Sequence, residues 1–361
     1  MSARMSTSIT LFCLLLTSCQ SEKPKPQAVK MRICEGYPPK VIATLHERQT
    51  QVSSAGSKFS FPRFQQMINV SKTWKPRDVI TVAFKGGTVS LRQQIAVAVR
   101  PWADVANVTF DFGSLSAGTF REWSESDTDF KAVVRISFDS PGYWSLVGRD
   151  SVDRSLVKPT EPSMNFEGFT DSLPSDWQAT VLHEFGHALG FEHEHQIPQS
   201  ACQTDFRWDD DPGYVTTKDT FGQYVPDDQN RSPGLYTILG GPPNRWDRAT
   251  IEFNLKELAF SKDMRLSPFD KLSIMKYYFD IWMFKRPDSQ CYSPQNLVLS
   301  VDDQKVVSEI YPRNAEDMRG VLDEKIRTLN TLDKVQDLPA DMRSTYRSSI
   351  KSLTTEKSKM H

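Results

Sequence analysis

The chain has 361 residues, of which 38% are hydrophobic, and this length supports one sizeable core with extensions. Its 44 basic and 45 acidic residues leave a formal net charge of −1. That balance argues against nucleic acid as a partner and against an electrostatic hold on a lipid surface.

The first residues have the pattern of an export signal. Arg4 precedes an apolar run over residues 9–16, which is too short to span a hydrocarbon core of ~30 Å. The run ends in Leu-Thr-Ser-Cys, which resembles a bacterial lipobox and predicts a lipoprotein signal peptide over residues 1–18 with Cys19 lipidated. An ordinary secretory signal with a chance cysteine is the alternative. With Gln20 next, we expect a protein anchored in the bacterial cell envelope, at the outer membrane where one exists.

A strand-helix-strand pattern follows an irregular start. Residues 19–74 contain several prolines and little periodicity, so we interpret them as a tether and lead-in. Residues 79–84 predict a strand, residues 91–105 a helix and residues 108–112 a second strand. A third strand is expected over residues 132–138.

The next periodic segment is a helix that begins near Trp177. Apolar side chains recur at three- and four-residue steps as far as Leu189, and Asp176 is the expected N-cap. This helix carries the first part of a stretch that reads H-E-F-G-H-A-L-G-F-E-H.

That stretch has the spacing of a metal site. His183 and His187 lie one turn apart, so both imidazoles can reach one metal ion, with Glu184 beside them. Gly190 tolerates the left-handed backbone that ends a helix, so His193 returns from the other side. Three neutral nitrogens leave a fourth position for water, which is the coordination of a catalytic zinc.

These residues resemble the zinc motif of the metzincin zinc endopeptidases. Residues 273–277, Ser-Ile-Met-Lys-Tyr, resemble the Met-turn of that clan in its astacin form. Phe191 and Glu194 also fit the astacin extension of the motif, whereas Lys276 stands where histidine is usual. The chain is most similar to the bacterial astacin-like and matrixin-like secreted enzymes.

The resemblance implies an α+β fold in two subdomains. A mixed N-terminal sheet with the active-site helix would be followed by a mostly irregular and helical C-terminal subdomain, together spanning residues 75–312. The strand before the zinc helix, residues 164–166, would be an edge strand over the cleft that binds an extended peptide antiparallel. A plain strand without substrate contact is the alternative.

The resemblance also implies one Zn²⁺ per chain, a protein or peptide substrate and a role for each site residue. His183, His187 and His193 would hold the metal, Glu184 would be the general base, and Tyr277 would stabilise the oxyanion. Met275 would form the apolar floor. Two alternatives stay open: a surface lipoprotein that only binds a partner through this fold, and a zinc amidase that acts on a cell-wall crosslink.

The cysteines and one acidic loop leave further choices open. Cys202 and Cys291 flank the catalytic half and are the favoured disulfide, although the sequence does not settle the connectivity. Cys34 is interpreted as an unremarkable cysteine, with a zinc-capping latency switch as the alternative. The aspartates at 209–211 indicate a solvated loop rather than a calcium site.

The end of the chain is predicted to be helical. Residues 300–312 begin with a capping pattern and resemble the closing helix of astacin-type domains. The extension, residues 313–361, carries two apolar stripes separated by Pro339 and predicts a helical hairpin. We expect it to pack back on the catalytic domain, with partner docking as the alternative. The stripes comprise Leu322, Ile326, Leu329, Leu332 and Val335, then Met342, Tyr346, Ile350 and Leu353.

Overall fold

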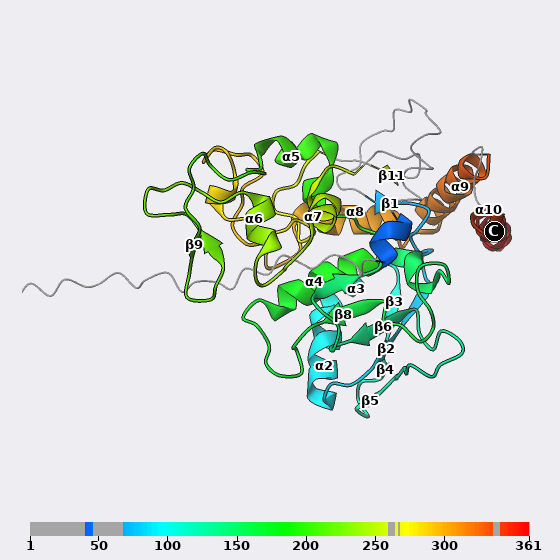
Figure 1. Ribbon diagram of the computed structural model, residues 1–361. Helices are drawn as coiled ribbons and strands as arrows, with labels where there is room; N and C mark the ends of the chain where they lie inside the picture. Colours follow the sequence, from blue (N-terminus) through cyan, green and yellow to red (C-terminus); the bar gives the residue numbers. More distant parts are fainter. Residues whose placement is uncertain (1–39, 46–67, 259–263, 266–267, 335–339, 361) are drawn as a thin grey trace, which may run out of the picture. The chain divides into compact units, whose positions relative to one another are not determined.

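The computed structural model describes residues 40–45, 68–258, 264–265, 268–334 and 340–360 (Figure 1). A five-stranded sheet has the strand order β3-β2-β6-β8-β7, and it is mixed, as the predicted α+β fold implied. Neighbouring strands run parallel except β7, which is antiparallel to β8. The strands are β2 (Val79–Phe84), β3 (Thr109–Asp111), β6 (Val134–Ser137), β7 (Tyr143–Ser145) and β8 (Met164–Phe166).

The helix expected over residues 91–105 is two helices. α2 (Val89–Ala98) begins earlier than predicted because the Thr88 hydroxyl accepts a hydrogen bond from the Leu91 amide, 3.1 Å away. α3 (Arg100–Val105) follows after a break, since Pro101 has no N–H with which to continue the first helix.

β8, the strand before the zinc helix, is not the edge strand that we expected. It lies between β6 and β7, and β7 forms the edge. The chain turns back after β6, so β7 pairs with β8 in the opposite direction. Asn165 fastens this turn, because its side-chain amide donates to the carbonyls of Ser140, at 2.7 Å, and Gly142, at 2.6 Å.

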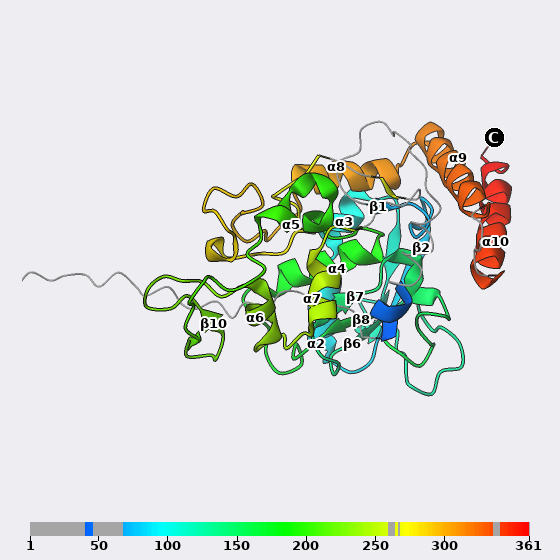
Figure 2. The ribbon, with the colours of Figure 1, turned by 45° about the horizontal axis from the view of Figure 1, so that its top comes forward.

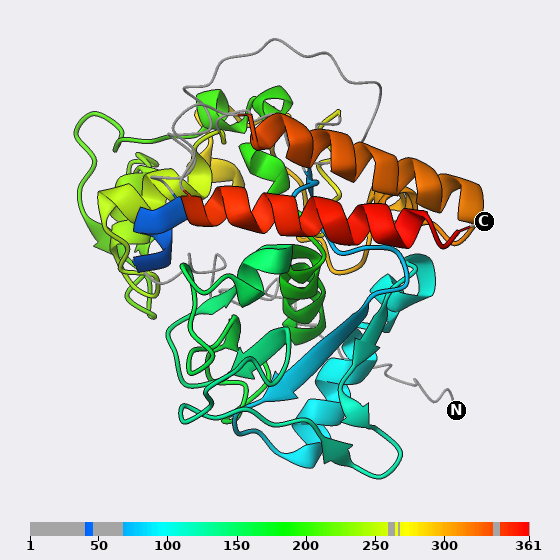
Figure 3. The same cartoon turned by 90° about the vertical axis from the view of Figure 1, so that its right-hand side faces the viewer.

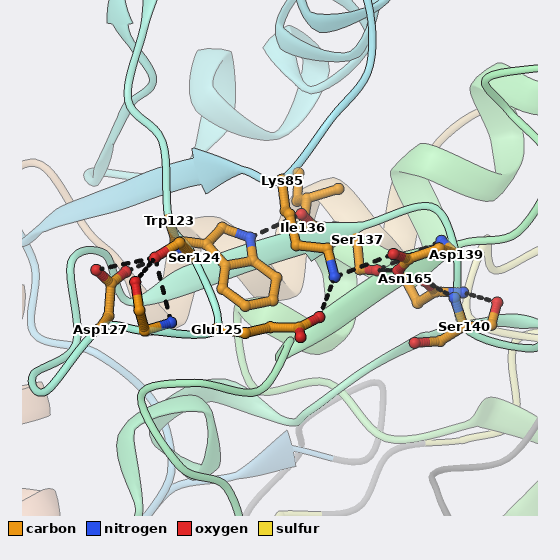
Figure 4. A network of polar contacts seen from close by, with 11 residues as sticks. Lys85, Trp123, Ser124, Glu125, Asp127, Ile136, Ser137, Asp139, Ser140 and Asn165 are labelled. Atoms are coloured by element: carbon orange, nitrogen blue, oxygen red, sulfur yellow. Dashed lines mark hydrogen bonds and ion pairs between the residues drawn. The ribbon is translucent and has the colours of Figure 1, made fainter.

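A polar network lies at the carboxyl ends of β2 and β6 (Figure 4). Lys85 follows β2 and pairs with Glu125 and with Asp139, which lies 3.0 Å away after β6. Trp123 donates its indole N–H to the Ile136 carbonyl at 2.8 Å. These contacts hold the connecting loops against the sheet without entering the metal site.

The second half of the domain is built from short helices and turns, as predicted. The capping box that Ser300 and Asp303 form at the start of α8 confirms the capping pattern expected there. The elements are α5 (Cys202–Asp205), α6 (Leu235–Gly240), α7 (Arg248–Leu255), α8 (Val301–Ile310), β9 (Thr217–Lys218), β10 (Tyr224–Val225), η2 (Glu194–Gln196), η3 (Pro198–Ser200) and η4 (Ile281–Met283). The first half also contains the hairpin of β4 (Gly113–Ser114) and β5 (Thr119–Phe120), and η1 (Gly148–Val152).

A disulfide and the hydrogen bonds of an acidic loop stabilise this half. Cys202 and Cys291 form a disulfide, which confirms the favoured pairing. In the acidic loop, Asp210 accepts from the Gly234 amide at 2.7 Å and Asp211 from the Ser232 amide at 2.8 Å. These carboxylates therefore cap backbone amides, as in an ordinary structured loop.

Two outer segments, β1 and the C-terminal helices, pack on this body. β1 (Ile68–Asn69) pairs with β11 (Met264–Arg265), so residues that the sequence placed in the lead-in belong to the packed structure. α9 (Ala315–Leu332) and α10 (Ala340–Lys357) form the predicted helical hairpin (Figure 3). Leu322, Leu329, Leu332 and Leu353 form its core. Cys19, Cys34, Val335 and Pro339 lie outside the described residues.

Candidate metal centre

The centre is built on α4 (Trp177–Ala188), which lies against α2 and the edge strand β7 (Figure 2). Its second half is buried, including His183, Glu184 and His187. Asp176 is the N-cap residue, as predicted, although its side chain makes no capping hydrogen bond. Its carboxylate instead accepts from the Gln295 amide, 2.6 Å away.

Gly190 turns the chain at the end of α4. Its φ is +102°, a backbone region that residues with a side chain rarely adopt, and its amide donates to the His187 carbonyl at 2.8 Å. A Cβ on Gly190 would lie 2.7 Å from Thr73 Cγ2, so a side chain is excluded there by contact as well. The turn returns the chain with His193 facing α4, as the sequence predicted.

The three histidines converge on one point. Nε2 of His187 lies 3.2 Å from Nε2 of His183 and 3.0 Å from Nε2 of His193. A tetrahedral zinc with Zn–N bonds of about 2.0–2.1 Å places its nitrogens about 3.3 Å apart. Within the described part of the chain, these residues are the one group of histidine, cysteine or acidic side chains with metal-binding spacing.

Each imidazole is fixed through its other nitrogen. Nδ1 of His183 lies 2.7 Å from the Ile274 carbonyl, and Nδ1 of His187 lies 2.8 Å from the Phe191 carbonyl. A carbonyl can only accept, so Nδ1 carries the proton and Nε2 keeps its lone pair for a metal. Burial lowers the pKa of His183 to about 4, and burial together with the neighbouring imidazoles lowers the pKa of His187 and of His193 well below the usual value. The ligands are therefore neutral near pH 7.

Gln196 orients the third histidine, and sequence reasoning missed it. Its side-chain oxygen lies 2.9 Å from Nδ1 of His193. Its Nε2 donates to the carbonyls of Phe253, at 2.8 Å, and Lys256, at 3.0 Å, which leaves the oxygen facing the imidazole. The only local signal was its position three residues after a ligand.

The Met-turn bonds both to α4 and to the segment that follows the Gly190 turn. The Ile274 carbonyl holds His183, and the Met275 carbonyl accepts from the Glu194 amide at 3.1 Å. Met275 is fully buried beneath α4, where a Cβ on Gly186 would lie 2.3 Å from its sulfur. A side chain at Gly186 would therefore displace the Met275 side chain below it.

Tyr277 packs against the histidines, and Lys276 precedes it in the Met-turn. The Tyr277 ring centroid is 4.2 Å from that of His193 and 5.7 Å from that of His183. Lys276 is buried and donates to the Tyr277 carbonyl at 2.9 Å. Desolvation lowers the pKa of this lysine to about 7.

Comparisons with known proteins agree with this geometry. No family model and no curated protein matches the chain. A solved structure of myroilysin, a bacterial astacin-like metalloprotease, is similar to it, with 29% identity, a TM-score of 0.51, and coverage of 69% of this chain and 99% of that one. In its fold and its three-histidine ligand set, the chain is similar to astacin-like metzincins. That fold and those ligands are those of a zinc metalloendopeptidase, a hydrolase.

Two further structures give lower scores. Another structure of myroilysin has 25% identity and a TM-score of 0.44, with coverage of 78% of this chain and 100% of that one. The hatching enzyme zinc-protease high choriolytic enzyme 1 of the medaka fish Oryzias latipes has 15% identity and a TM-score of 0.35, with coverage of 72% and 99%.

Proposed function

We propose that this protein is an exported zinc endopeptidase with one metal ion per chain. The observation that carries the proposal is the convergence of three neutral Nε2 atoms at 3.0 and 3.2 Å, in a fold shared with myroilysin. His183, His187 and His193 would hold the zinc, because their spacing and their protonation suit nitrogen ligands of this ion. A bound zinc supplies Lewis-acid polarisation of a carbonyl and lowers the pKa of a coordinated water toward about 7.

Glu184 is the proposed general base. Its carboxylate is buried and lies in the same turn of α4 as His183. A general base must lie close to the water whose proton it takes, and this position beside the metal ligands meets that condition. It accepts the proton of the attacking water and then delivers it to the leaving amine, so that the peptide bond breaks without a free proton crossing the site.

Tyr277 and β7 would act on the substrate. The Tyr277 ring lies against His193, so its hydroxyl is proposed to donate to the oxyanion that forms on the scissile carbonyl. β7 is the edge of the sheet beside α4, and an extended peptide is proposed to pair with it through main-chain hydrogen bonds. Main-chain pairing gives affinity with little selection by sequence.

Export is proposed from the N-terminal signal and the disulfide. Disulfides persist in oxidising compartments, and Cys202 pairs with Cys291. Lipidation of Cys19 would then hold the protein at the cell envelope. In the described part of the chain, no helix combines the length and the apolar character needed to cross a bilayer.

The test removes the base and keeps the ligands. Glu184→Gln retains size and should retain zinc, while turnover of an unbiased peptide mixture falls by at least ~10²-fold. Glu316→Gln, on the exposed start of α9, is the matched control and should cleave at the parent rate. A Glu184→Gln protein that holds zinc and cleaves as fast as the parent would refute the proposed mechanism.

A further inference from the structure

The segment of residues 69–75, called the clasp below, lies against the turn that delivers the third ligand. The Trp74 indole donates to the Ala188 carbonyl at 2.7 Å, and the Asn69 amide donates to the Gly190 carbonyl at 3.2 Å. Thr73 fills the space that a side chain on Gly190 would occupy. The last carbonyls of a helix have no partner within it, so these contacts satisfy groups that would otherwise need water.

Tyr311, just after α8, completes this set. Its hydroxyl donates to the Leu189 carbonyl at 2.6 Å and accepts from the Trp74 amide at 3.2 Å. The carbonyls of Ala188, Leu189 and Gly190 are thus all bonded by the clasp or by the residue that touches it. The path of the chain from α4 to His193 depends on these bonds.

Lys325, on α9, holds the clasp from its other side. Its side chain is buried, and Nζ donates to the carbonyls of Thr73, at 2.7 Å, Val70, at 3.0 Å, and Trp74, at 3.3 Å, and to the Thr73 hydroxyl. An ammonium group has three N–H donors and no acceptor, so a cluster of carbonyls suits it. Burying such a charge is unfavourable unless it is well bonded, which makes this contact specific.

We propose that Lys325 is a positioning residue for the metal centre. It fixes the clasp, the clasp fixes the Gly190 turn, and the turn fixes His193. The C-terminal hairpin, which the sequence predicted to pack on the catalytic domain, thereby slows the release of zinc. The inference rests on the proposed zinc site. It adds a residue that controls zinc release and that lies 251 to 255 positions along the chain from the clasp residues that it bonds.

The experiment measures zinc release from the full chain into an excess of a coloured chelator, with no peptide present. Lys325→Met removes the donors and keeps much of the volume, and release should become about 10-fold faster or more, since partners that orient metal ligands commonly change affinity by 10- to 100-fold. Trp74→Phe removes the bond to Ala188 and should also speed release. Because both act through one path, the double variant should release zinc no faster than about the faster single variant.

Controls separate this role from general stability. Lys334→Met changes an exposed lysine just past α9 and should release zinc at the parent rate. Trypsin should cut metal-free Lys325→Met at Lys72 or Lys75 faster than the metal-free parent, a readout that involves neither zinc nor activity. Lys325→Gln, which keeps two N–H donors, is measured alongside to provide a second folded variant.

The outcomes distinguish the inference from the proposed function. Parent-like release from the folded Lys325 variants, even with a lower melting temperature, overturns the inference and leaves the peptidase proposal standing. Multiplied effects in the double variant also overturn it, because they place the two residues on independent paths. Conversely, a Glu184→Gln protein with full activity would refute the mechanism without changing the zinc-release result.

Discussion

Lys276, which is buried beside Tyr277, makes the stability of the fold depend on pH. Burial lowers its pKa to about 7 in the folded chain, against 10.5 in an unfolded one. Between these values the unfolded state binds the extra proton, so the free energy of unfolding falls as the pH falls from 10.5 to 7 and is then constant. The lysine therefore destabilises the fold at neutral pH.

Lys276→Met should remove this slope. Relative to the parent, the variant should gain up to a few kcal/mol in unfolding free energy at pH 7 and almost nothing above pH 10, since each pKa unit corresponds to about 1.4 kcal/mol. Urea unfolding at pH 7, 8.5 and 10 measures the difference. Lys158→Met, at an exposed position whose charge does not contribute to the pKa of Lys276, is the control. A parent and variant that differ equally at all three pH values would contradict the prediction.

Residues of the centre differ in how far the sequence could predict them. The three histidines and Gly190 lie within eleven consecutive residues, so helix periodicity and the glycine turn were enough. Gln196 became visible only in the fold, because the carbonyls that orient it lie 57 and 60 residues away. Lys325 likewise reads as one polar residue on an amphipathic helix until its partners are known.

At the scale of elements, the disulfide joins α5, after the zinc motif, to the segment after η4. The two cysteines are 89 residues apart and fully buried. Closing a loop of this length restricts the unfolded chain and should stabilise the fold by ~4–5 kcal/mol in the chain-entropy model.

The double variant Cys202→Ser/Cys291→Ser tests this contribution. Its free energy of unfolding in urea should be lower than that of the parent by roughly that amount, or somewhat less where the unfolded chain retains structure. A reductant present throughout unfolding should lower the parent to the same level and leave the variant unchanged. Equal stability of parent and variant without reductant would show that the crosslink contributes nothing.

Elements were predicted best where local patterning decides them. β2, β6 and α4 follow from apolar runs and helical spacing, and the structure has them close to the expected positions. The order of strands was predicted less well, because pairing depends on where the chain turns back. β7 takes the edge since Asn165 ties residues 140–142 into a tight reversal, a contact that no periodicity encodes.

At the scale of the whole molecule, segments that are far apart in sequence act together on the metal centre. The clasp connects β1 to the body, and α9 reaches the clasp through Lys325. Lys75 adds a salt bridge to Glu356 on α10. A domain boundary at residue 313 marks where the resemblance to known enzymes ends. It does not mark a boundary in the packing, because the hairpin contacts the clasp.

Attachment to the cell envelope is the remaining proposal for the whole molecule, and it rests on one residue before the described fold. If Cys19 is lipidated, Cys19→Ser should move the protein from the detergent-extracted membrane fraction to the soluble secreted or periplasmic fraction, because the protein part alone has a net charge near zero and no electrostatic hold on lipid. Cys34→Ser, in the predicted tether, is the matched control and should leave the partition unchanged. Immunoblots of the two fractions measure it. Membrane retention of the Cys19→Ser protein equal to that of the parent would refute lipid anchoring and leave the ordinary secretory signal as the explanation of the N-terminal pattern.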